Sequence, residues 1–203
     1  MSRAFLLAAL ALTPLAFADP DALTAFLENT QTFQADFRQE LRDTAGQVLE
    51  VSAGRVLIKR PNRFQWLYQE PYEQLVLADG ERLWIYDKGL AQASVALIGE
   101  ALAATPAMLL SGERVVSEEF EMQASFERDG LQWVLLKPRP ANSDFRRLAL
   151  AFEGATLRFM ELEDNLSQVT WIEFSNADLN PALNDDQFRF EPPEGVDVIG
   201  EGA

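Results

Sequence analysis

The chain of 203 residues contains neither cysteine nor histidine. The absence of cysteine excludes disulfides, thiolate nucleophiles and cysteine-bound metal, and also a lipid anchor attached to an N-terminal cysteine. The absence of histidine removes the commonest general base, the Ser-His-Asp arrangement and most zinc sites. We therefore expect no disulfide, no metal site and a core that alone stabilises the fold.

Further signatures of catalysis are also missing. The sequence holds no G-x-S-x-G element, no phosphate-binding loop and no dinucleotide-binding glycine pattern. The 32 acidic residues could supply a glycosidase pair, but most stand singly among polar neighbours, as a solvated surface does. We predict a protein that is not an enzyme and that needs no cofactor.

Positive charge is scarce as well. The formal net charge is −15, from 17 basic and 32 acidic residues. This balance disfavours nucleic acid and unassisted docking on anionic lipid. The acidic surface can serve to keep a greasy binder dissolved, or it can contact a basic partner.

The first eighteen residues have the pattern of a secretory signal. Arg3 precedes the apolar run 4–12, which is too short to span a bilayer, and Ala16-Phe17-Ala18 fits a cleavage site. The alternative is a buried N-terminal helix. We expect cleavage after Ala18, export, no stable membrane insertion, and a single mature domain over residues 19–203.

Hydrophobic periodicity predicts few helices and many strands. Residues 20–31 have helical spacing, and so do the Ala- and Leu-rich stretch 97–104 and the short run 106–110. Alternation and turn signals predict strands over residues 33–42, 48–59, 63–69, 75–78, 83–87, 120–128, 131–137, 145–153, 156–163 and 168–174, and a brief strand at the end of 184–190.

The order of these elements favours an antiparallel meander. Strands joined by tight turns, about ten in number, tend to curl into a barrel or half-barrel. Several strands are apolar on both faces, for example residues 83–86, 131–136 and 148–152. This surplus is either packed core or the wall of an apolar pocket that the helices cover.

Five segments of the sequence form a specific series. The first is Ile58-Lys59-Arg60-Pro61-Asn62-Arg63-Phe64-Gln65-Trp66, in which an aromatic strand follows a basic pair and a proline. The others are residues 70–75, 79–87, 105–112 and 188–196. Taken in order, these segments resemble the LolA family of periplasmic lipoprotein carriers. Lys88-Gly89 and Ala91 depart from the family pattern, in a predicted loop before the lid.

The resemblance implies a fold and a function. It implies a mostly β protein with an α lid, an incomplete, half-open antiparallel β-barrel of ten to eleven strands around an apolar cavity. Members of the family accept a triacylated lipoprotein from an inner-membrane ABC-type release complex and pass it to an outer-membrane receptor of similar fold. A monomer is the family expectation. The alternatives are a sensor or regulatory module with the same half-barrel, and an enzyme acting on an envelope glycan or lipid.

The resemblance also assigns residues. Arg60 matches the family arginine that hydrogen-bonds carbonyls of the lid and holds the empty form closed. Phe64 and Trp66 are expected on the wall or rim of the cavity mouth, and Met108 and Leu109 on the lid. The full set expected at the acyl cavity or its mouth is Leu23, Phe26, Leu27, Phe33, Phe37, Phe64, Trp66, Trp84, Met108, Leu109 and Leu110.

Overall fold

The computed structural model describes residues 22–98, 110–111, 119–139 and 143–200. Within these residues, twelve strands form one sheet in the order β12-β6-β5-β4-β3-β2-β1-β11-β10-β9-β8-β7. The strands are β1 Thr32–Arg42, β2 Val48–Lys59, β3 Arg63–Glu70, β4 Gln74–Asp79, β5 Arg82–Asp87, β6 Gln92–Leu97, β7 Phe120–Arg128, β8 Leu131–Pro138, β9 Phe145–Glu153, β10 Thr156–Asp164, β11 Val169–Leu179 and β12 Asp197–Gly200.

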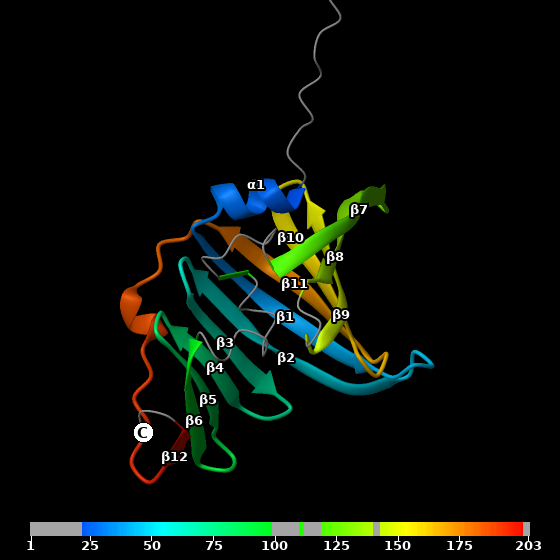
Figure 1. Ribbon diagram of the computed structural model, residues 1–203. Helices are drawn as coiled ribbons and strands as arrows, with labels where there is room; N and C mark the ends of the chain where they lie inside the picture. The colour runs from blue at the N-terminus through cyan, green and yellow to red at the C-terminus, as the bar shows by residue number, and fades with distance from the viewer. Residues whose placement is uncertain (1–21, 99–109, 112–118, 140–142, 201–203) are drawn as a thin grey trace, which may run out of the picture.

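The sheet is open and strongly curved. β7 and β12 are its two edges, so it does not close into a full barrel. Neighbouring strands pair antiparallel, as in β1 with β2 and with β11, except that β12 runs parallel to β6. Figure 1 shows the sheet wrapping around a concave side, with α1 Ala22–Asn29 lying across one end of it. This arrangement confirms the predicted half-open antiparallel barrel.

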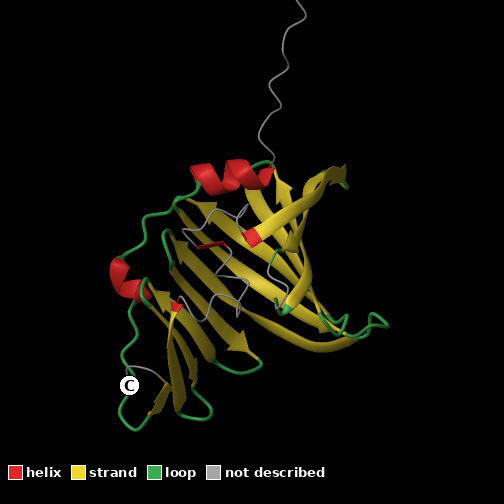
Figure 2. Cartoon of the chain, viewed as in Figure 1, coloured by secondary structure: helices red, strands yellow, loops and turns green. Residues whose placement is uncertain are grey.

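The first strand lies inside the sheet rather than at its edge. β2 to β6 and β12 lie on one side of β1, and β11 to β7 lie on the other. We call these the first and second half-sheets. The helix α1 immediately precedes β1 in the chain but contacts β8 and β9 of the second half-sheet. Figure 2 shows how little helix the fold contains beside the strands.

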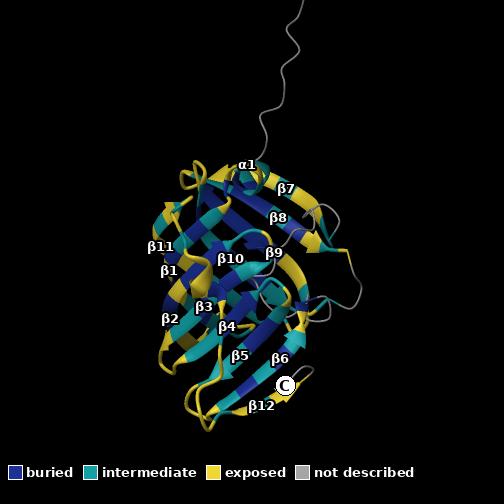
Figure 3. Ribbon diagram, turned by 90° about the vertical axis from the view of Figure 1, so that its left-hand side faces the viewer, coloured by how far each residue is buried: buried dark blue, intermediate teal, exposed yellow. Residues whose placement is uncertain are grey.

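Burial follows the alternation of the strands. Along β1, Phe33, Ala35 and Phe37 are buried, while the residues between them are half-buried or exposed. Figure 3 shows the same interleaving of buried and more exposed residues on other strands. The buried side chains of one face meet on the concave side and form the main core. Burial of this shared face stabilises the curved sheet.

A close approach of backbone explains the glycine in β2. A glycine within a strand indicates a bulge or bend, and the pairing of β2 with β3 does shift register between Ala53 and Gly54. A Cβ atom on Gly54 would lie only 1.9 Å from the carbonyl oxygen of Leu67. No side chain larger than hydrogen fits here unless the backbone moves.

Most predicted strands agree with the structure. The sequence-based expectations differ from it at three places, which are β6, the tail after Gly195 and residues 184–190. The sequence does not predict β6, because the alternation of Gln92–Leu97 extends only to Val95 and most of its residues are small. From the sequence we expect a loosely ordered tail after Gly195, but Asp197–Gly200 forms β12, which pairs with β6. The brief strand predicted within 184–190 is wrong, since Asp185–Phe188 forms a 3-10 helix, η1, capped by Asn184.

The predicted helices differ in how far they are described. The helix predicted over 20–31 is α1 from Ala22 to Asn29. Most of the lid segment 97–111 lies outside the described residues, as does the predicted signal segment. At its described ends, Leu97 closes β6, Ile98 is buried, and Leu110 and Ser111 are fully buried.

Candidate functional site: a bridged lid over an apolar interior

Arg60 reaches from the end of β2 to the last turn of α1. Its Nη1 donates to the carbonyl oxygens of Leu27 at 2.7 Å and Thr30 at 2.6 Å. Its Nε donates to the carbonyl oxygen of Leu110 at 2.9 Å. We call this set of contacts the Arg60 bridge. A planar guanidinium suits it, because a fixed fork of donors can serve several carbonyls at once.

The position of the carbonyls makes a cation favourable. The last carbonyls of a helix have no partner within the helix, and the helix dipole places partial negative charge there. The Arg60 guanidinium supplies both the missing donors and the positive charge, and it also lies 5.3 Å from the centre of the Phe26 ring. Burial lowers the pKa of Arg60 to about 10, so the side chain still carries its charge at neutral pH.

Backbone contacts reinforce the same junction. The amide of Arg60 donates to the carbonyl of Gln31 at 2.9 Å, and the amide of Asn62 donates to the carbonyl of Ser111 at 2.8 Å. The turn that follows β2 is therefore hydrogen-bonded through its backbone both to the residue two positions past the end of α1 and to the Leu110–Ser111 segment. Arg60 thus donates to the carbonyls of Leu27, Thr30 and Leu110, and its expected role in holding the empty form closed stays a prediction.

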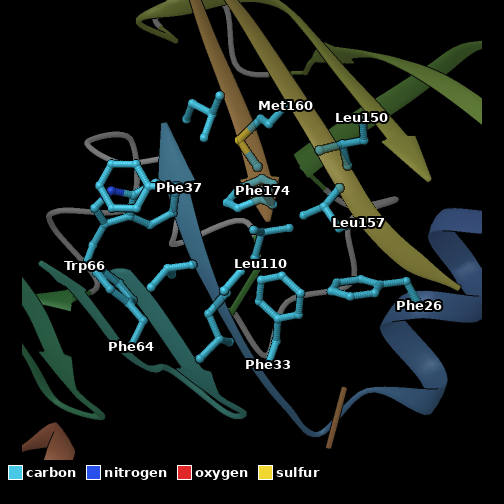
Figure 4. Packing of buried hydrophobic residues seen from close by; sticks show 14 of the residues in the cluster. Phe26, Phe33, Phe37, Phe64, Trp66, Leu110, Leu150, Leu157, Met160 and Phe174 are labelled. Carbon is cyan, nitrogen blue, oxygen red and sulfur yellow. The ribbon is translucent and has the colours of Figure 1, made fainter. Parts of the chain in front are cut away.

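Beneath the bridge lies a continuous apolar interior. Phe26 of α1 packs against Phe33 of β1 at 5.8 Å and Phe152 of β9 at 5.6 Å between ring centres. Figure 4 shows Leu110 among these rings, with Phe26 at one end of the cluster and Trp66 and Phe37 at the other. The structure brings together these predicted site residues: Leu23, Phe26, Phe33, Phe37, Phe64, Trp66 and Leu110, with Leu27 packed against them.

Trp84 is placed elsewhere. Its neighbour Leu83 belongs to the interior cluster, so the alternation of β5 turns Trp84 to the opposite face. There it packs with Leu77 and Val95 and against Phe190 of the C-terminal segment. Trp84 therefore covers the outer face of the first half-sheet rather than the interior. Met108 and Leu109 lie outside the described residues.

At the end remote from α1, the concave face becomes polar. The hydroxyl of Tyr68 donates to Oε1 of Gln39 at 3.3 Å, and the hydroxyl of Ser52 donates to a carboxylate oxygen of Glu50 at 3.3 Å. Burial raises the pKa of Tyr68 to about 12, so its hydroxyl keeps its proton. Sequence reasoning missed this cluster, although the interruption of the apolar alternation at Gln39 and Ser52 is visible in the sequence.

A pocket of different chemistry lies outside this apolar interior. It has a volume of about 330 Å³ and lies between the first half-sheet and η1. Lys59 and Arg63 both hold the carboxylate of Asp185 there, and the hydrogen bond from Lys59 is the main cause of a lowered pKa of Asp185. Its lining is mostly charged and unsuited to hydrocarbon: Arg63, Asp79, Glu81, Asp185, Phe188 and Arg189.

The described residues contain neither of two other kinds of site. In these segments no group of three or more acidic, cysteine or histidine residues is arranged to hold a metal ion. Among the helices described, none has the length and hydropathy needed to cross a membrane.

Known proteins are similar to this chain in sequence and in fold. The family described as "Outer membrane lipoprotein carrier protein LolA" matches residues 28–191. An outer-membrane lipoprotein carrier protein of Nitrosospira multiformis is 41% identical over 182 residues, which is 89% of this chain and 87% of that protein. The protein of the same name from Bordetella avium is 37% identical over 98% of this chain and 97% of its own length.

Solved structures agree at the level of the fold. An uncharacterized conserved protein of Thermus thermophilus superposes with a TM-score of 0.55 at 13% identity, over 88% of this chain and 96% of its own. A LolA superfamily protein of Nitrosomonas europaea superposes with a TM-score of 0.50 at 14% identity, over 83% and 96%. With the sequence match over most of its length, the chain belongs to the LolA family of outer-membrane lipoprotein carrier proteins.

Proposed function

We propose that this protein is a periplasmic carrier of triacylated lipoproteins. It takes its cargo from an inner-membrane ABC-type release complex, shields the acyl chains against its concave face, and hands the cargo to an outer-membrane receptor of similar fold. The Arg60 bridge over a continuous apolar interior is the observation that carries the proposal. The names of the relatives support it.

The energetics of acyl chains call for such a carrier. Burial of an acyl chain is worth about 0.8 kcal/mol per methylene group, so several chains together are worth tens of kcal/mol. Free diffusion of the cargo through water is therefore negligible. A rigid, complementary pocket would hold the chains too tightly for release, so a carrier needs an empty state with its own stabilising contacts.

The Arg60 bridge supplies contacts of that kind. When the interior opens, its hydrogen bonds to the carbonyls of Leu27, Thr30 and Leu110 are lost. Their loss offsets part of the free energy gained from acyl burial. Loading and release then require no covalent chemistry, and the protein acts without catalysis or cofactor.

We also propose how the chain is exported and processed. Residues 1–18 direct export and are removed after Ala18, and residues 19–203 form the single carrier domain, which works as a monomer. N-terminal sequencing of the protein purified from the periplasm tests the cleavage. A mature chain that begins at another residue would contradict this site.

Displacement of a fluorescent apolar probe tests the carrier function. We expect a triacylated lipopeptide to displace the probe from the purified protein, and the same peptide without acyl chains to leave it bound. Mass spectrometry of protein isolated from the periplasm should detect bound acylated polypeptide. Equal displacement by both peptides, or by neither, would overturn the proposal.

A further inference from the structure

The interior changes from apolar to polar along three neighbouring strands. On the concave face of β1 the order from the Arg60 end is Phe33, Phe37, Gln39, and on β3 it is Phe64, Trp66, Tyr68. β2, which lies between them, runs from Ile58 through Val56 and Gly54 to Ser52 and Glu50. All three strands become polar toward the same end, remote from α1.

Gly54 allows this end to form. It faces Phe37 on one side and Tyr68 on the other in the strand pairing, and it has no side chain between them. The Phe37 and Tyr68 rings therefore meet edge to face at 5.2 Å, and the Tyr68 hydroxyl reaches Gln39 across β2. Trp66 packs on the same Phe37 ring at 4.9 Å.

The Trp66 indole holds a donor without an acceptor. Trp66 is 3% exposed, and its Nε1 is buried with no hydrogen-bond partner among the described residues. Burial raises the pKa of the Tyr68 hydroxyl and the nearby Trp66 N–H lowers it in part, but the two groups do not reach hydrogen-bonding geometry. A buried N–H that has no partner among the described residues is a ready donor for a carbonyl that enters the interior.

Resting on the carrier function proposed above, we propose that Nε1 of Trp66 and the side-chain amide of Gln39, which the Tyr68 hydroxyl orients, donate hydrogen bonds to the ester carbonyls of the acylated cargo. The hydrocarbon tails would then point toward the Arg60 end and the peptide toward the polar end. Ester carbonyls need such partners, because a polar group taken out of water without a hydrogen bond costs free energy. This cluster orients the cargo, which burial of the tails alone does not do.

Two lipopeptides that differ only in their ester carbonyls test the proposal. The probes are a tripalmitoylated cysteinyl peptide with ester-linked chains and its analogue with ether links, which lacks the ester carbonyls. Tyr68→Phe removes only the hydroxyl, and Gln39→Leu removes the amide at similar volume. Each variant is expected to weaken binding of the ester peptide about fivefold, the effect of one net hydrogen bond, and to leave binding of the ether peptide unchanged.

Tyr72→Phe is the matched control, since the Tyr72 side chain is 80% exposed. It should bind both peptides as the wild type does. Trp66→Phe is a further variant. Relative to the wild type, it should weaken binding of the ester peptide more than binding of the ether peptide. If Tyr68→Phe and Gln39→Leu affect both peptides equally, or neither, the polar end is structural and the inference is overturned alone. Failure of the wild type to bind either peptide overturns the carrier function itself.

Discussion

Nη1 of Arg60 lies 2.7 Å from the carbonyl oxygen of Leu27, so a side chain at the end of β2 binds the last turn of a helix that precedes β1. The helix rests on β8 and β9, at the other side of the sheet. One guanidinium thus connects the two half-sheets at the end where α1 crosses the concave side. Changes at Arg60 should affect the opening of the interior more than the sheet itself.

Replacement of Arg60 by leucine should impair cargo cycling without loss of the fold. Arg60→Leu removes the donors for the Leu27, Thr30 and Leu110 carbonyls, so the empty state loses its closing contacts. The circular dichroism spectrum should remain that of the wild type, while transfer of lipoprotein to acceptor membranes slows. Arg55→Leu, an exposed change on the same strand, is the control. Wild-type transfer rates in Arg60→Leu would refute the role of the bridge.

Phe64→Glu should lower both transfer and stability. From the sequence alone we expect transfer to suffer more than the melting temperature, as befits a wall or rim residue. The structure buries Phe64 completely, so a carboxylate there would cost several kcal/mol or open the interior. Phe64→Leu keeps the site apolar and should cost about 1 kcal/mol. Urea unfolding of both variants measures the difference; a Glu variant as stable as the wild type would show that Phe64 is not core.

Gly54→Ala should destabilise the protein by about 3 kcal/mol. The new Cβ would lie 1.9 Å from the Leu67 carbonyl oxygen, and that atom belongs to backbone, which yields little. Gly46→Ala is the control: it has open space around it and a positive φ of 80°, so a cost of about 1 kcal/mol is expected. Denaturant titration gives both values. Similar costs at the two glycines would argue against the close approach.

Glu40 should make stability depend on acid pH. Arg42 and then Arg38 hydrogen-bond its carboxylate and hold its pKa below the ordinary 4.5. Because the folded pKa is the lower one, this stabilisation is present above pH 4.5 and is lost as the pH falls through the folded value. The free energy of unfolding of Glu40→Gln should therefore be lower than that of the wild type at pH 7. The gap should shrink below pH 4.5.

Glu121→Gln, on the exposed part of β7, is the control for the acid titration. It should follow the wild-type curve at all pH values. A gap between Glu40→Gln and the wild type that stays constant from pH 7 to pH 3 would show that hydrogen bonding by the carboxylate is not responsible.

Strands flanked by clear turn signals could be predicted from the sequence, and elements fixed by distant contacts could not. Residues 48–59, 120–128 and 145–153 were placed at the observed bounds, because turn residues border these segments rich in apolar residues. β6 and β12 depend on each other, because each supplies the other's edge partner. Neither Gln92–Leu97 nor Asp197–Gly200 carries a strong pattern of its own, so their pairing is a tertiary effect.

The candidate site divides in a similar way. A period of two along β3 and the resemblance around Arg60 were enough to select Phe64, Trp66 and Arg60. The face of Trp84 was harder, because residues 83–86 are apolar on both sides and only the packing of Phe190 shows that the outer side is covered. The polar end was missed because Gln39, Ser52 and Tyr68 lie on three strands and meet only in the folded sheet.

The central place of β1 in the sheet has a mechanical consequence. Among the described residues, the edge strands β7 and β12 do not pair with each other. The curvature of the sheet can therefore vary with little loss of hydrogen bonds between strands. A modest change of twist along β1 and its neighbours would widen or narrow the whole concave side of the sheet at once. Under the proposed carrier function, the same molecule would then accommodate cargo with bulkier or fewer acyl chains.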